Sequence, residues 1–113
     1  MSRNDPLLLQ DILDAVAAIE RHRPASRAVL DEDELVRVFV QKQLEIIGEA
    51  AARLTDAMRN SSPGVPWRSI IGMRNRLVHD YANVDCDTMW AVLEQHLDPL
   101  RVEVEKLVHD LTG

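Results

Sequence analysis

Apolar residues recur at steps of three and four along four segments of the 113-residue chain, and no segment shows the sustained apolar–polar alternation of a half-buried strand. This spacing places the apolar side chains on one face of each segment when it is wound as an α-helix. The length of the chain suits one domain with a single core. We therefore predict an all-α fold, an antiparallel four-helix bundle that occupies residues 1–113 as one domain. The apolar positions are Leu9, Ile12, Leu13, Val16 and Ile19; Leu35, Phe39, Ile46, Ile47, Ala50 and Leu54; Trp67, Ile70, Ile71, Leu77 and Val78; and Trp90, Leu93, Leu97, Leu100, Val104, Leu107 and Leu111.

The first two helices have recognisable beginnings. Asp5 followed by Pro6 is typical of an N-cap and a first helical residue, and the helical pattern continues from there toward Pro24. The acidic run at residues 31–34 suits the positive end of a helix dipole. Residues 35 to about 58 contain no proline, so we predict a second helix of roughly 35 Å.

A loop separates this pair from the second half of the chain. Residues 60–66, NSSPGVP, combine Asn, Ser, Gly and two prolines, and the last proline is placed to start a third helix over residues 67–81. Asp85 or Asp87 can cap the fourth helix. Pro99 should kink that helix near its middle, because proline removes a backbone hydrogen bond.

Composition limits the classes of function. The formal net charge of −6 argues against a broad basic surface that coats nucleic acid, although residues 67–81 hold three arginines against one acid. No secretory signal or apolar run of membrane-spanning length is visible, so we expect a cytoplasmic protein without membrane contact. The single cysteine, Cys86, predicts no intrachain disulfide, and the spacing of the Cys and His residues predicts neither a metal site nor a cofactor.

Arg74 is the unusual residue of the third helix. On a helical wheel it falls near the centre of the apolar stripe of residues 67–81. One interpretation is an ion pair inside the bundle with Glu45 or Glu49 of the second helix, since an unpaired buried guanidinium is costly. The other is that Arg74 forms the floor of a cleft that binds a phosphate. The two interpretations are compatible.

Three further residues of this segment carry possible chemistry. His79 lies about 140° around the helix from Arg74, on a polar side that it shares with Asn75 and the side-chain-free Gly72. Histidine is the side chain best suited to moving protons near neutral pH. A straight helix keeps Arg74 and His79 on different sides, so a common site needs a bent helix end or a second subunit, and we favour a paired site across a dimer cleft. Tyr81, about 20° from Arg74, is either a core tyrosine with its hydroxyl at the rim or a phenol available for modification.

The same residues carry a family resemblance. Arg74, the next four residues, His79, Asp80 and Tyr81 match the RX4HXY motif of the HEPN superfamily. The surrounding PWRSIIGMRNRLVHDY and the phrase QLEIIGEAAARL of the second helix resemble the HepT toxin family, and the similarity covers nearly the whole chain.

This resemblance implies a four- or five-helix bundle that dimerises, with the motif helices of two subunits facing one cleft. It also implies a toxic, metal-independent endoribonuclease that cuts RNA through the 2′-hydroxyl, a route unavailable to DNA. Carried onto this chain, His79 would move the proton, Arg74 would hold the scissile phosphate, and Asn75 would support them. The implied partner is an MNT-type nucleotidyltransferase antitoxin, which would silence the nuclease by transferring AMP onto Tyr81.

Two alternatives stay open. A non-catalytic helical binding module that partners a nucleotidyltransferase fits the negative charge and the apolar seam of residues 90–111. A metal-dependent hydrolase would use His79 with Asp80 or Asp85, but no other ligands in the sequence converge on them.

Overall fold

The computed structural model describes residues 4–79 and 86–112, with only the backbone of Val78 and His79. Every regular element in these ranges is helical, so the predicted all-α class is confirmed. The long helices are α1 (Asp5–Arg21), α3 (Glu34–Arg53), α5 (Trp67–His79) and α7 (Leu97–Thr112). The short ones are α2 (Arg27–Glu32), α4 (Asp56–Asn60), α6 (Cys86–Ala91) and the π-helical turn η2 (Val92–His96).

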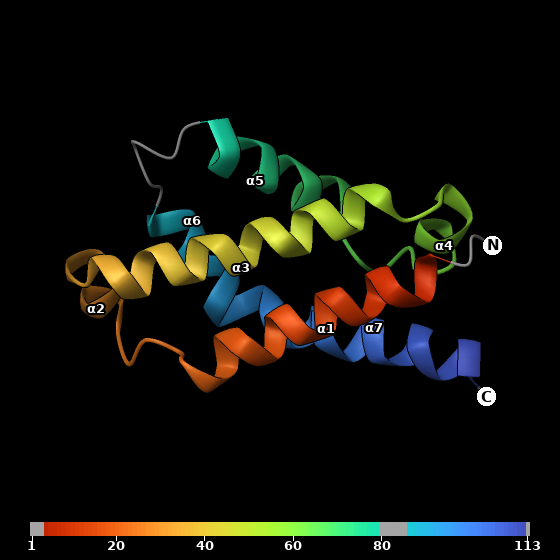
Figure 1. The fold of residues 1–113 in the computed structure, drawn as a ribbon, viewed down its shortest axis with the longest axis horizontal. Coiled ribbons are helices and arrows are strands. Elements are labelled where there is room, and N and C mark those ends of the chain that lie inside the picture. Colours follow the sequence, from red (N-terminus) through yellow and green to blue (C-terminus); the bar gives the residue numbers. More distant parts are fainter. Residues whose placement is uncertain (1–3, 80–85, 113) are drawn as a thin grey trace.

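Helix α3 is the centre of the bundle. Helices α1 and α5 both pack along it, and α7 packs on α1 (Figure 1). Successive long helices run in opposite directions, as predicted (Figure 1). The apolar seam of the last segment is buried, because Leu93, Leu97 and Val104 are each at most 1% exposed. None of the helices within the described ranges is long and apolar enough to cross a membrane.

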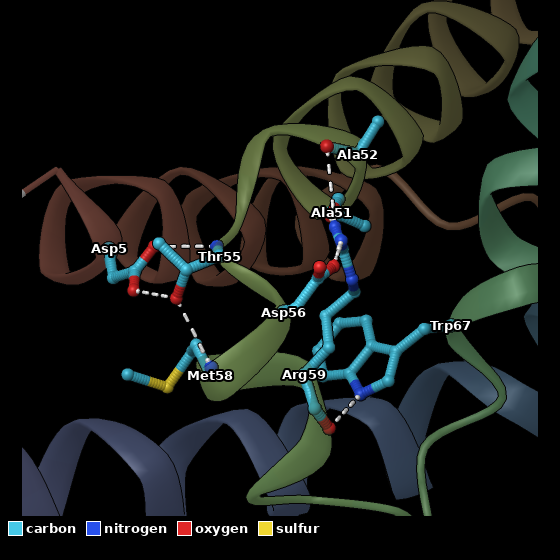
Figure 2. A network of polar contacts seen from close by, with 8 residues as sticks. All are labelled: Asp5, Ala51, Ala52, Thr55, Asp56, Met58, Arg59 and Trp67. Atoms are coloured by element: carbon cyan, nitrogen blue, oxygen red, sulfur yellow. Dashed lines mark hydrogen bonds and ion pairs between the residues drawn. The ribbon is translucent and has the colours of Figure 1, made fainter. Parts of the chain in front are cut away.

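Asp5 does not cap α1, contrary to the prediction. It lies inside the helix with its side chain 0% exposed, and Asn4 holds the N-cap position. Its carboxylate accepts hydrogen bonds from the backbone nitrogen of Thr55 at 3.1 Å and from Thr55 Oγ1 at 2.7 Å (Figure 2). A buried carboxylate needs donors, and here they come from a residue 50 positions later in the chain. Asp5 therefore ties the start of α1 to the end of α3.

The second predicted helix ends earlier than expected, at Arg53 instead of Met58. Leu54 is extended, with ψ of 149°, and Thr55 starts α4 by accepting a hydrogen bond from the nitrogen of Met58 at 3.2 Å. Arg59 donates to the carbonyl oxygen of Ala51 at 2.9 Å and thereby satisfies the open end of α3 (Figure 2). Neither proline nor glycine marks this break, so the apolar spacing alone could not locate it.

The start of α3 follows the prediction. Asp33, within the acidic run, is its N-cap, and one carboxylate oxygen accepts from the nitrogens of Leu35 at 3.1 Å and Val36 at 3.2 Å. The stretch before it forms α2, which Ser26 caps through the nitrogen of Val29 at 3.4 Å.

The last segment bends where proline requires it. The ring of Pro99 clashes with a regular helical carbonyl four residues earlier, at Gln95, and that residue lies within the π-helical turn η2. Figure 1 shows the chain changing direction between α6 and α7. Asp87 lies in the first turn of α6, whereas the other predicted cap, Asp85, is outside the described residues.

Candidate functional site

Helix α5 buries a face that differs from the predicted stripe. Trp67, Met73 and Leu77 are 8%, 5% and 5% exposed, whereas Ile70 and Ile71 are only half-buried. The buried face is thus centred nearer to Met73, which the predicted stripe left out. Arg74 is less buried than the residues of this face, with 29% of its side chain exposed, although its Cβ lies against Gly48 of α3.

Both ends of α5 are fixed by polar contacts. The indole nitrogen of Trp67 donates to the carbonyl oxygens of Arg59 and Ser62, both at 3.1 Å. At the other end, the buried side chain of Gln41 donates from Nε2 to the carbonyl oxygen of Leu77 at 3.4 Å. This carbonyl lies two residues before His79, so the end of α5 that carries the motif histidine is held against α3.

A glycine of α3 allows Arg74 to come close. A Cβ atom added to Gly48 would lie 2.1 Å from Cβ of Arg74 and 3.2 Å from the carbonyl oxygen of Ile70. No side chain larger than hydrogen fits between the two helices here. Gly48 therefore determines how closely Arg74 approaches the backbone of α3.

The guanidinium of Arg74 has two contacts among the described residues. Its Nη2 forms an ion pair with Oε2 of Glu49 at 2.5 Å, and its Nη1 donates to Oδ1 of Asn75 at 2.7 Å. The predicted pairing with Glu45 or Glu49 is thereby confirmed for Glu49. The Glu49 side chain is 50% exposed, so the pair lies at the surface of the bundle.

A hollow of about 310 Å³ opens beside this ion pair, over α3 and between α1 and α5. We call it the Arg74 hollow. Its cationic and acidic side chains are equal in number, and neither Lys42 nor Arg53 forms an ion pair with another described residue. The guanidinium thus borders a recess of mixed charged and apolar lining that is large enough for a phosphate group. The lining residues are Leu8, Asp11, Lys42, Glu45, Ile46, Glu49, Ala50, Arg53 and Arg74.

The other arginines of α5 do not join Arg74. Arg76 lines a second, mainly apolar hollow of about 380 Å³ on the opposite side of α5, together with Met73, Val92 and His96. Arg68 is exposed. The positive charge that the sequence concentrates in residues 67–81 is therefore divided between different faces of the helix.

The structure brings Arg74 and Asn75 together but leaves the rest of the predicted site undescribed. Asn75 is exposed and lies about 100° around α5 from Arg74, so the guanidinium turns from the buried face toward the polar side of the helix. His79 is the last residue of α5, one turn after Asn75, and its side chain is outside the described residues. Tyr81 is outside them as well.

Metal binding is tested only in part. Within residues 4–79 and 86–112, no three His, Cys, Asp or Glu side chains are grouped so that they could hold a metal ion. The residues that the metal-dependent alternative needs, His79, Asp80 and Asp85, lie outside the described side chains. Burial, with a hydrogen bond to Asp31, raises the pKa of the Cys86 thiol, which favours the neutral form over a reactive thiolate.

Sequence reasoning missed two residues that position this site, Gly48 and Gln41. Each had a signal: a glycine inside a proline-free helical stretch, and a glutamine at a position that the structure buries. Neither feature indicated which residue is contacted, because the contacts of Gly48 with Arg74 and of Gln41 with Leu77 each join residues more than 20 positions apart.

Comparison with known proteins defines the class. The family model described as "Ribonuclease HepT-like" matches residues 12–107. The chain belongs to the HepT-like ribonuclease family, and the resemblance found in its motifs is confirmed.

Individual relatives cover almost the whole chain. A protein of Methanocaldococcus jannaschii named "Putative RNase" is 32% identical over 107 residues, which are 93% of this chain and 98% of the relative. A "Probable ribonuclease HepT" of Thermococcus cleftensis is 32% identical over 111 residues, covering 95% of this chain and 98% of the relative. No solved structure matches the chain.

Two glycine substitutions test the close approach of α3 and α5. We expect Gly48→Ala to lower the free energy of unfolding by about 1–3 kcal/mol, because the added methyl group overlaps Arg74. Gly72→Ala is the matched control: the added Cβ meets nothing within 4 Å, so this variant should gain up to about 1 kcal/mol from helix propensity. Urea unfolding followed by circular dichroism measures both. Equal stability of the two variants would contradict the contact.

Proposed function

We propose that this chain is the toxic, metal-independent endoribonuclease of a HEPN/MNT-type toxin–antitoxin system. The observation that carries the proposal is the state of Arg74, which Glu49 and Asn75 hold at the edge of a hollow while 29% of its side chain stays exposed. Membership of the HepT-like ribonuclease family and the names of the relatives support RNA as the substrate.

The reaction needs two proton transfers and a stabilised charge. The 2′-oxygen of the RNA attacks the adjacent phosphorus and gives up its proton, the bond from phosphorus to the 5′-oxygen breaks, and that oxygen takes a proton. The products are a 2′,3′-cyclic phosphate and a 5′-hydroxyl. Arg74 stabilises the charge on the non-bridging oxygens through its planar donor fork. His79 serves as base or acid, a role that contributes about 10²–10⁴-fold.

A second copy of the chain supplies the other half of the site. Leu35 and Val38 on α3 are 83% and 55% exposed, which is unusual for neighbouring large apolar residues. The hydrogen bond from Gln41 to Leu77 places this part of α3 beside the end of α5. A two-fold dimer over Leu35 and Val38 would bury the apolar surface and bring two His79 residues to one cleft.

Removal of either proposed reacting group should slow cleavage strongly. We expect Arg74→Ala to lower the cleavage rate of an RNA oligonucleotide about 10²–10³-fold, and His79→Ala about 10²–10⁴-fold. Arg76→Ala is the control. This variant also loses one positive charge from α5, but Arg76 lines the mainly apolar hollow on the opposite side of the helix. The assay contains excess EDTA, and the products are analysed by mass spectrometry for the cyclic phosphate.

Other outcomes of that assay identify the alternatives. Cleavage that stops in EDTA would support the metal-dependent hydrolase. A wild-type chain that binds a nucleotidyltransferase but leaves RNA intact would support the non-catalytic binding module. An oligonucleotide with a 2′-deoxynucleotide at the cut position should resist the enzyme, and its cleavage would contradict attack by the 2′-hydroxyl.

The dimer is tested by a charge placed in its apolar contact. We expect Val38→Glu to shift the protein from dimer to monomer in analytical ultracentrifugation and to remove RNA cleavage, because a carboxylate cannot be buried there without a partner. Val102→Glu is the control on α7, where Val102 is 41% exposed. A wild-type monomer that cleaves RNA at full rate would refute the shared site.

Control by the antitoxin acts on Tyr81. The phenol oxygen loses its proton to solvent or a base of the partner and attacks the α-phosphorus of ATP, the bond from that phosphorus to the oxygen that bridges to the β-phosphate breaks, and pyrophosphate leaves. Tyr81 comes two positions after His79 in the sequence, and two residues of chain span at most about 7 Å. The added AMP would bring negative charge and bulk to the site and repel RNA.

Modification of Tyr81 has a simple readout, because it is the only tyrosine in the sequence. We expect the chain co-expressed with its nucleotidyltransferase to gain the mass of one or more AMP groups and to lose RNA cleavage while it keeps its fold. Tyr81→Phe should cleave RNA, gain no AMP and arrest growth in the presence of the partner. Full neutralisation of Tyr81→Phe by the partner would show that silencing takes another route.

A further inference from the structure

Two neighbouring residues of α3 determine the position of the Arg74 side chain. Gly48 sets the distance of its Cβ from the backbone of α3, and Glu49 holds its Nη2. On the other side, Asn75 accepts from Nη1. Both terminal nitrogens of the guanidinium therefore have a partner on the protein.

Besides Glu49, two other acids line the Arg74 hollow, Asp11 and Glu45, and Glu45 allows the effect of charge to be separated from the effect of orientation. Glu45 lies one helical turn before Glu49 and lines the same hollow, but its carboxylate is in no described ion pair with Arg74. The carboxylates of Glu45 and Glu49 thus add similar negative charge near a bound phosphate. Of these two carboxylates, only that of Glu49 forms a described ion pair with the guanidinium.

We propose that Glu49 is a positioning residue of the RNA cleavage reaction, which orients Arg74 toward the scissile phosphate. The inference rests on the proposed function. Asn75 accepts one hydrogen bond from Nη1 and Glu49 pairs with the charge at Nη2, and because each terminal nitrogen of a guanidinium carries two hydrogens, donors remain for the phosphate oxygens. A fixed donor fork acts without reorganisation when charge develops in the transition state.

Folding stability does not account for the ion pair, because the Glu49 carboxylate is half exposed and such pairs contribute little. Glu49 also has a cost: a carboxylate next to a phosphate-binding arginine repels RNA. Orientation and repulsion act on different kinetic constants. Loss of Glu49 should lower kcat through the misplaced arginine and leave KM unchanged or lower it.

The test compares Glu49→Gln, Glu49→Ala and Glu45→Gln in the full chain. We expect kcat to fall about 10–100-fold for Glu49→Ala, less for Glu49→Gln, whose amide oxygen can still accept, and not at all for Glu45→Gln. All three should keep the thermal unfolding midpoint of the wild type. An unchanged kcat in Glu49→Ala, or an equal loss in Glu45→Gln, would overturn the proposal.

A second measurement does not depend on activity. In the wild type, the contacts at both terminal nitrogens should slow rotation of the Arg74 guanidinium, so that nitrogen-15 spectra resolve its separate Nη signals. These signals should merge in Glu49→Ala and persist in Glu45→Gln. If the wild-type chain cleaves no RNA, the proposed function fails, and these spectra still decide whether Glu49 orients Arg74. Merged signals in the wild type would refute the positioning.

Discussion

The contact between Gly48 and Arg74 is the constraint on which the rest of the site depends. Helix α5 approaches α3 until the position of a missing Cβ is 2.1 Å from Cβ of Arg74. The side chain of Arg74 starts at this contact and remains 29% exposed. It runs along the surface of α3 to Glu49, and Asn75 of its own helix completes the enclosure. A packing requirement thus determines where a permanent positive charge stands.

The positive charge of Arg74 stands in a protein whose formal net charge is negative. The chain carries a formal net charge of −6, and the Arg74 hollow itself contains acids beside its cations. Because salt screens charges over about 8 Å under physiological conditions, the distant acids oppose RNA only weakly. The groups within hydrogen-bonding reach decide whether a phosphate is held. A protein of this kind can recognise a single phosphodiester without the broad basic surface of a nucleic-acid-coating protein.

The sequence predicted the long helices well because their apolar spacing reports burial directly. The prediction failed at helix ends and polar contacts, where side chains outside the apolar pattern determine the structure. Asp5 was predicted as an N-cap because its local sequence is typical of one. The hydrogen bond between Asp5 and Thr55 joins residues 50 positions apart, so local sequence could not show it. Arg74 was correctly expected to meet an acid of the second helix. The spacing did not decide between Glu45 and Glu49, and the structure shows the pair with Glu49.

The bond between Asp5 and Thr55 also has a consequence for the order of assembly on the ribosome. Both partners, and the whole of α1 and α3, belong to the first 55 residues, so this helical hairpin is synthesised before α5. Gly48 and Glu49 therefore leave the ribosome ahead of the helix that packs against them. Helix α5 is followed in its turn by α6, η2 and α7, and a truncated product that stops before α5 would carry the first helices of the framework without Arg74.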